Sequence, residues 1–349
     1  SKKGTLLWVL DKTSTSMGGR ALRRWLNDPL IDTLEINKRL ESVKELKDDV
    51  ILRGDVVENL KKVYDIERLA GKMTYGNANA RDMITLKNSL ERLPEVKSVL
   101  AMCQSHKLKE LYENLDELKD VFALIEKSIV EDPPMTIKDG GIIKLGYDEE
   151  IDTLKKASTE GKTWLAKLEA DEKEKTGIKT LKVGYNKVFG YYIEVSKSFV
   201  SQVPERFIRK QTLTTGERYI TEELKTIENQ ILGAEEKVVN LEYNAFVEIR
   251  TEIAKNIKRL QKTANVVSTL DVLSSFAQVA EDMNYCMPVV KDDGIINIKE
   301  GRHPVIEKMI GSGNFVPNDT YLDKEGDRLA IITGPNMAGK STYMRQVAL

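Results

Sequence analysis

Eight residues near the end of the sequence have the types and spacing of a phosphate-binding loop. They run from Gly334 to Ser341 and fit the pattern G-x-x-x-x-G-K-[ST] without a mismatch. Residues 328–333 before them are typical of a buried strand, and residues 342–347 after them are typical of a helix start. In such a loop the glycines turn backbone N–H groups toward phosphate, Lys340 reaches the β- and γ-phosphates, and Ser341 holds Mg²⁺. We therefore expect ATP or ADP with Mg²⁺ to bind at Gly334, Pro335, Asn336, Met337, Ala338, Gly339, Lys340, Ser341 and Thr342.

Two long helical patterns precede this loop. Apolar or small residues recur in steps of three and four from 151 to 168. The same spacing runs from Leu224 to Leu260, and its first six steps alternate in the manner of a coiled-coil seam. As one helix, residues 224–260 would span about 55 Å, which is too long for the core of a single globular domain. The second helix must therefore pack along another long helix, and 151–168 is the candidate.

The period changes from helix to strand between these two patterns. Residues 181–195 are rich in aromatic and β-branched side chains, and residues 207–213 and 217–220 flank Thr214-Thr215-Gly216, a hairpin signal. The sequence therefore predicts a small antiparallel β module where the two long helices end. From 175 to 221 nine basic residues stand against three acidic ones, a local charge of +6, although the whole chain has a net charge of -1.

That local charge favours a nucleic-acid backbone as the ligand of the β module, because backbone phosphates are bound through Lys and Arg without regard to base sequence. The candidate DNA contacts are Lys182, Lys187, Lys197, Arg209, Lys210 and Arg218. On this pattern alone, a tip that binds protein and a merely solvated surface remain alternatives.

Composition is typical of a cytoplasmic protein. The two cysteines, Cys103 and Cys286, are far apart and have no metal-ligand partners nearby in the sequence, as expected for reduced structural thiols. No apolar run reaches about 18 residues, so no membrane span is expected. The chain ends at Leu349 inside a helical pattern without a stop signal, and we interpret that end as a truncation.

The phosphate loop also resembles that of a known family. The segment from Thr333 to Gln346 is similar to the loop of the MutS family of bacterial DNA mismatch-repair ATPases, because its Pro-Asn-Met insert and the Thr-Tyr-Met-Arg-Gln that follows are far narrower than the general pattern. Ala338 stands where many members carry glycine. Residues 301–304 and 315–319 resemble the start of that family's ATPase domain, 181–186 with 190–193 its clamp, and 65–69 its lever core.

The resemblance spans nearly the whole chain and implies a division into domains. Residues 1–150 would form a helical core and lever domain, 151–176 and 221–285 long lever helices, 177–220 a DNA-gripping β clamp, and 286–349 the start of a truncated ATPase domain. The expected fold is therefore mainly α with a small antiparallel β module, and it ends in a truncated P-loop α/β segment.

The resemblance also implies partners. In the family, two subunits form a homodimeric ring around double-stranded DNA, mismatched in the full-length protein, and a downstream mismatch-repair factor receives the signal. Phe315 matches the residue that stacks on adenine; its alternative is a core phenylalanine that anchors the loop. His303 is better interpreted as a structural turn residue, because no carboxylate or metal ligand is evident beside it.

Other parts of the family's pattern are missing from the sequence, among them the mismatch-reading domain and the acidic strand that activates Mg²⁺ and water. We therefore assign no catalytic residue and predict that this chain alone does not hydrolyse ATP. A chromosome-organising coiled-coil ATPase would instead place its phosphate loop near the N-terminus. A small-molecule kinase or a transporter ATPase would not need so long a helix ahead of its loop.

Overall fold

The computed structural model describes residues 2–311, 313–335 and 339–349, and it confirms the expected mainly helical fold with a small antiparallel β module. The chain forms two compact units. The first comprises residues 1–77, 85–122 and 253–349, and the second comprises residues 78–84 and 123–252. Of the helices described, none has the length and apolar character that crossing a membrane requires.

The first unit is organised around one buried helix, α12 (Ile257–Asp282). This helix contacts α2, α3, α4, α5 and α8, and every residue from Val266 to Ser275 is buried. A helix covered on every side lies inside a core rather than on its surface. The bounds of the helices up to residue 114 are α1 (Leu6–Leu10), α2 (Ser16–Asn27), α3 (Thr33–Asp48), α4 (Val50–Leu60), α5 (Ile66–Thr74), α6 (Ala80–Leu90), which is divided between the two units, α7 (Leu93–Leu100) and α8 (His106–Asn114).

A buried carboxylate fixes the start of α2 against α12. Asp271 accepts hydrogen bonds from the backbone N–H groups of Ser14 and Thr15, both at 2.8 Å, and from the Thr15 hydroxyl at 2.7 Å. The Thr15 hydroxyl in turn accepts from the Gly18 N–H at the N-terminus of α2. An added Cβ at Gly18 would lie 2.1 Å from the Asp271 carboxylate, so a side chain there would displace this contact.

The last part of the first unit holds β5 (Ile296–Gly301), α13 (Pro304–Ile310), β6 (Asn318–Leu322) and α14 (Lys340–Ala348). Strands β5 and β6 pair antiparallel, with Ile296 opposite Leu322. The strand expected over residues 328–333 does not form, and Leu329 and Ile331 are 82% and 83% exposed. Such a strand needs neighbours to cover both of its faces, and the described residues supply none beside it. Of the expected strand–loop–helix segment, the helix is therefore present and the strand is not.

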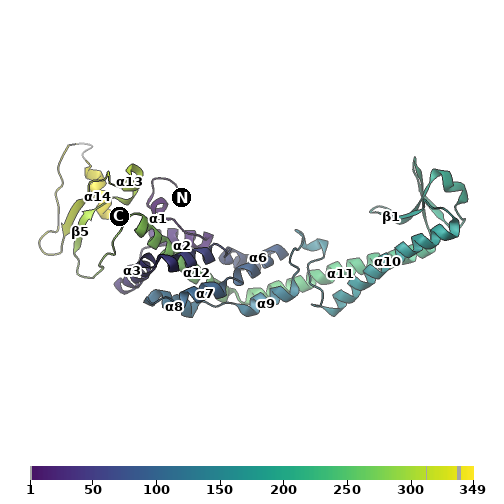
Figure 1. The fold of residues 1–349 in the computed structure, drawn as a ribbon, viewed down its shortest axis with the longest axis horizontal. Helices are drawn as coiled ribbons and strands as arrows, with labels where there is room; N and C mark the ends of the chain where they lie inside the picture. Colours follow the sequence, from purple (N-terminus) through teal and green to yellow (C-terminus); the bar gives the residue numbers. More distant parts are fainter. Residues whose placement is uncertain (1, 312, 336–338) are drawn as a thin grey trace. The chain divides into compact units, whose positions relative to one another are not determined.

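The second unit contains a pair of long helices and a four-stranded sheet (Figure 1). Helix α10 (Glu149–Thr176) runs beside α11 (Glu222–Lys255), and the sheet lies where α10 ends and α11 begins. The strands are β1 (Lys182–Asn186), β2 (Gly190–Ser196), β3 (Ile208–Thr212) and β4 (Gly216–Ile220), in the spatial order β1-β2-β4-β3. The unit also contains most of α9 (Lys119–Ser128) and the short 3-10 helices η1 (Ile137–Asp139) and η2 (Lys197–Gln202).

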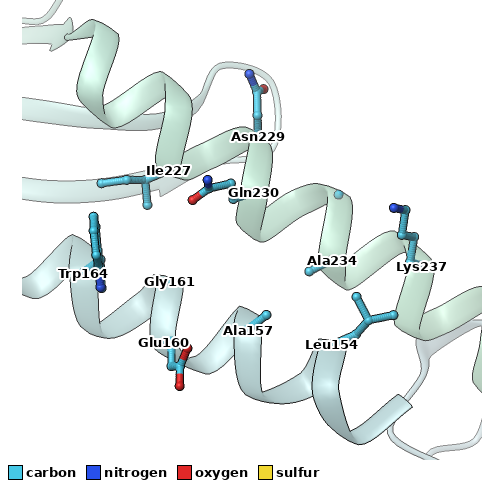
Figure 2. A pocket seen from close by; sticks show the side chains of 11 residues that line it. Leu154, Ala157, Glu160, Gly161, Trp164, Ile227, Asn229, Gln230, Ala234 and Lys237 are labelled. Atoms are coloured by element: carbon cyan, nitrogen blue, oxygen red, sulfur yellow. The ribbon is translucent and has the colours of Figure 1, made fainter. Parts of the chain in front are cut away.

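Contacts along α10 and α11 show that the two helices are antiparallel. A Cβ at Gly161 of α10 would lie 2.4 Å from the Ile231 side chain of α11. Lys162 pairs with Glu235 at 2.9 Å, and seven residues earlier Lys155 reaches a residue seven positions further along α11. Beside this crossing the helices leave a groove of about 610 Å³, with Trp164 and Ile227 at one end and Leu154 at the other (Figure 2).

The second long helix is not continuous, contrary to the expectation of one helix over residues 224–260. Helix α11 ends at Lys255 and α12 begins at Ile257. Between them the Asn256 N–H bonds to the Ile253 carbonyl three residues back, and its side-chain oxygen accepts from Arg259 Nη1 at 2.9 Å. Asn256 is the N-cap of α12, but its side chain makes no capping hydrogen bond to that helix. The hydrophobic spacing continues across the break, so it could not reveal the break.

Candidate nucleic-acid interface and nucleotide site

The two faces of the sheet differ in character because side chains alternate along each strand. One face packs on the helix pair and forms a core with it. The sheet and its flanks contribute Leu181, Ile193, Val195, Phe207 and Tyr219, and the helices contribute Leu165, Leu168, Leu224, Ile227 and Ile231. The opposite face carries a polar row in register, in which Lys182 faces Glu194, Glu194 faces Arg218, and Arg218 faces Gln211.

Four of the six candidate DNA contacts are exposed lysines of the β module: Lys182, Lys187, Lys197 and Lys210. Lys187 lies in the turn between β1 and β2, and Lys197 begins η2 directly after β2. Lys210 is skipped in the pairing of β3 with β4, where the register shifts between Arg209 and Gln211. A bulge on an edge strand turns a side chain away from the regular pleat. These ammonium groups therefore lie on the outside of the module.

The two arginine candidates are held by carboxylates. Arg209 Nη1 lies 3.3 Å from Glu217, which also accepts a hydrogen bond from the Tyr219 hydroxyl at 2.6 Å. Burial and that hydrogen bond raise the pKa of Tyr219 to about 12. Arg218 donates from Nε to Glu194 at 2.9 Å and from Nη1 to Gln211 at 3.1 Å. Both arginines are therefore partly neutralised within the module.

Arg218 also lies over an aromatic ring, with its guanidinium carbon 4.1 Å from the centre of Tyr192. Gly184, the partner of Tyr192 in the neighbouring strand, leaves room for that ring, since a Cβ at Gly184 would lie 2.8 Å from the ring carbon Cζ. Cation–π stacking and two hydrogen bonds fix the orientation of Arg218. The count of basic and acidic residues in the sequence could not reveal these pairings, because strand register brings the partners together.

Of the predicted phosphate-binding loop, Asn336, Met337 and Ala338 lie outside the described residues. Gly339 has a left-handed conformation (φ 87°) and is the N-cap of α14. Lys340 donates from Nζ to the carbonyl oxygen of Gly334. The lysine that would reach phosphate therefore binds its own loop in this structure.

Several of these residues nevertheless share one cavity of about 760 Å³. Phe315, Gly339, Lys340 and Thr342 line it, together with Val316, Asn318, Ile331, Ile332, Thr333 and Tyr343. Phe315 is half-buried and faces the cavity lined by Lys340, an arrangement that suits a ring stacking on a base. Gly334, Pro335 and Ser341 are exposed and do not line the cavity. Within the described parts of the chain, no group of three or more His, Cys, Asp or Glu side chains could hold a metal ion.

His303 takes a structural position. It is the N-cap residue of α13, and its Nδ1 atom accepts from the Ile306 N–H at 3.5 Å. Burial lowers the pKa of His303 below its ordinary value of 6.5, so the neutral ring that can accept this hydrogen bond is favoured.

Comparison with known proteins agrees with this architecture. A family model described as MutS domain III matches residues 1–277, which include the helix pair and the sheet. These residues therefore form a domain of the MutS domain III class. The DNA mismatch repair protein MutS of Ruminiclostridium cellulolyticum is 59% identical over the whole chain, and that of Acetivibrio thermocellus is 56% identical. The chain therefore belongs to the MutS family. It spans 40% of the length of these two relatives.

Proposed function

We propose that this chain is the DNA-gripping and lever part of a DNA mismatch-repair protein, with the β module acting as the clamp on duplex DNA. The observation that carries the proposal is the set of exposed lysines on a sheet that is joined to a long helix pair through a common core. Lysines at the surface of such a module contact phosphates without reading bases. We further propose that the mismatch preference, homodimer and downstream partner belong to the full-length protein.

For the C-terminal segment we propose ATP or ADP with Mg²⁺ as ligands. The cavity shared by Phe315, Lys340 and Thr342 supports this assignment. In this role Lys340 would release Gly334 and turn to the phosphates, Phe315 would stack on the base, and Ser341 would supply a metal ligand. The divisions proposed for the chain are 1–150 for the core, 151–176 and 221–285 for the levers, 177–220 for the clamp and 286–349 for the start of the ATPase domain.

DNA binding is tested by titrating a matched duplex between about 50 and 200 mM salt, where phosphate contacts make affinity fall steeply. The triple variant Lys187→Ala, Arg209→Ala and Lys210→Ala should flatten the salt slope. The control is Lys61→Ala, Lys109→Ala and Lys258→Ala, three exposed lysines outside the module that give the same change in net charge. An unchanged slope in the first variant, or a clear preference of the wild-type chain for mismatched over matched duplex, would count against the proposal.

A protein-binding tip is the second candidate, and one observation favours it. Val188 is 80% exposed in the turn between β1 and β2, and the neighbouring Phe189 is also exposed. Adjacent exposed apolar side chains are more common at protein contacts than on free surfaces. If Val188→Ser with Phe189→Ser left the DNA salt slope unchanged while removing a protein–protein contact of the chain, this second function would be supported.

A further inference from the structure

Three carboxylates of the helix pair reach into the β module. Glu169 and Glu172 lie near the end of α10, and Glu228 lies near the start of α11. Each accepts hydrogen bonds from the module, and Glu169 also accepts one from Lys173 of its own helix. A sheet that lay on the helices through apolar contact alone would not need these directional contacts.

Glu172 makes the strongest of the three contacts. Its side chain is 1% exposed, and both oxygens accept from Arg206, at 3.1 Å from Nη1 and 2.7 Å from Nη2. Arg206 lies in the segment before β3, and its own side chain is 46% exposed. A buried carboxylate without a partner is costly, whereas a half-exposed guanidinium can be solvated. The pair therefore binds the module more firmly than a surface ion pair would.

The other two carboxylates bind backbone N–H groups of the sheet. Glu169 accepts from the Val183 N–H of β1 at 2.8 Å, and Glu228 accepts from the Tyr191 N–H of β2 at 3.1 Å. Gly190 allows the second contact, because its φ is +76° and a Cβ there would lie 1.7 Å from the Glu228 carboxylate. The sheet is thus attached at both β1 and β2, and near β3 through Arg206.

We propose that Glu172 is a positioning residue: through Arg206 it fixes the β module on the helix pair, so that the exposed lysines meet DNA as one rigid set. Arg206, although basic and within the module, is then an internal partner and not a phosphate ligand. This inference rests on the proposed DNA-binding function. In that case the β module moves together with the C-terminal end of α10 and does not rotate independently of it.

Positioning by Glu172 and long-range electrostatics predict opposite changes in the DNA affinity of the Glu172→Gln variant. Glu172→Gln removes one negative charge, so long-range attraction alone would tighten DNA binding. If Glu172 positions the module, the variant instead binds matched duplex at least about fivefold more weakly and with a shallower salt slope. Glu174→Gln is the matched control, since Glu174 is exposed on the same helix and the charge change is identical. It should bind as tightly as the wild-type chain or slightly more tightly.

Two further measurements separate positioning from a loss of fold. Affinities are measured well below the melting temperature of each variant, where a purely stabilising role would leave the salt slope unchanged. Arg206→Lys, which keeps the charge and one hydrogen bond, should remain within about threefold of wild-type affinity. Amide hydrogen exchange at Val183 and Tyr191 should accelerate in Glu172→Gln and not in Glu174→Gln.

The outcomes distinguish this inference from the function on which it rests. If the wild-type chain does not bind DNA, the proposed function fails, and exchange at the two amides still decides whether Glu172 holds the module. If Glu172→Gln binds DNA as tightly as Glu174→Gln or more tightly, with a steeper salt slope, then Glu172 only masks Arg206 from phosphate and the positioning role is wrong. Unchanged exchange at both amides would also overturn it.

Discussion

Lys155 of α10 places its Nζ atom 2.6 Å from Oε1 of Glu242 on α11, a carboxylate whose side chain has no exposed surface. Oε2 of Glu242 accepts the N–H groups of Gly141 and Ile142, and Oε1 accepts that of Ile143 at 3.3 Å. Gly141 and the preceding Gly140 both have left-handed φ values near +70°, which turns successive N–H groups toward one anion. This carboxylate therefore holds α10, α11 and the 140–143 segment together.

Removing that carboxylate should destabilise the second unit. We predict that Glu242→Ala lowers the free energy of unfolding by about 3–5 kcal/mol, because it leaves buried N–H groups without their acceptor and the Lys155 ammonium with the Ile143 carbonyl alone. Glu236→Ala, an exposed position on the same helix, should change it by less than about 0.5 kcal/mol. Urea unfolding followed by circular dichroism measures both values, and equal stabilities of the two variants would contradict the prediction.

The first unit should lose stability in acid through Arg259. Its guanidinium donates to Asp116 and Asp120, and these hydrogen bonds hold the pKa of both carboxyl groups below the ordinary value of 3.8. Groups with a depressed folded-state pKa stabilise the fold above that ordinary value, and the contribution is lost as pH falls through the folded-state pKa. We therefore predict that Arg259→Gln is less stable than wild type near pH 7 and that the difference shrinks toward about pH 3.

The measurement is the difference in urea midpoint between the two proteins at each pH. Both aspartates are partly exposed, so added salt should reduce the difference near neutral pH. A difference that grew as the pH fell below 3.8 would show that Arg259 acts through something other than these carboxylates.

The long helices and the β module could be predicted from the sequence, because their hydrophobic periods differ and each period persists over many residues. The hairpin over residues 208–220 was also predictable, from the turn residues around Gly216. Three features could not be obtained in this way. The break at Asn256 leaves the hydrophobic spacing intact, so the spacing could not locate it.

The other two features depend on contacts between distant residues. Arg218 and Glu194 are 24 positions apart and meet only through strand register. A count of charges along the sequence therefore cannot show that Arg218 is paired with a carboxylate. Residues 328–333 have the apolar composition of a strand, but a strand forms only where a neighbour can pair with it. The described residues offer 328–333 no neighbouring strand, so the strand that the apolar pattern predicts does not form and the segment is exposed.

That exposure leads to a prediction for the nucleotide site. Backbone N–H groups cradle phosphate only when the elements on both sides fix their directions, and Leu329 and Ile331 show no packing on the strand side. We predict that the purified chain releases phosphate from Mg-ATP at the same background rate as its Lys340→Ala variant. We also expect weak nucleotide binding that Phe315→Ala reduces further, measured with a fluorescent ATP analogue. Turnover that disappears in Lys340→Ala would show a working site and overturn this expectation.

The two long helices make a close contact at Gly161 of α10. A Cβ at Gly161 would lie 2.4 Å from Cγ1 of the buried Ile231, whereas a Cβ at Gly233 on α11 would meet nothing within 4 Å. Both glycines are helical and line the same groove, so they share the helix-propensity gain on substitution.

Gly233→Ala should therefore stabilise the second unit by about 0.5–1 kcal/mol, since alanine loses less backbone entropy on folding than glycine does. Gly161→Ala should lower its stability by about 1–3 kcal/mol despite the same gain, because the helices must separate to admit the methyl group. If Gly161→Ala costs much less stability in an Ile231→Ala background, which lacks Cγ1, than in the wild-type chain, the contact with Ile231 is the cause. A stabilised Gly161→Ala would show instead that α10 and α11 can move apart at this point without loss.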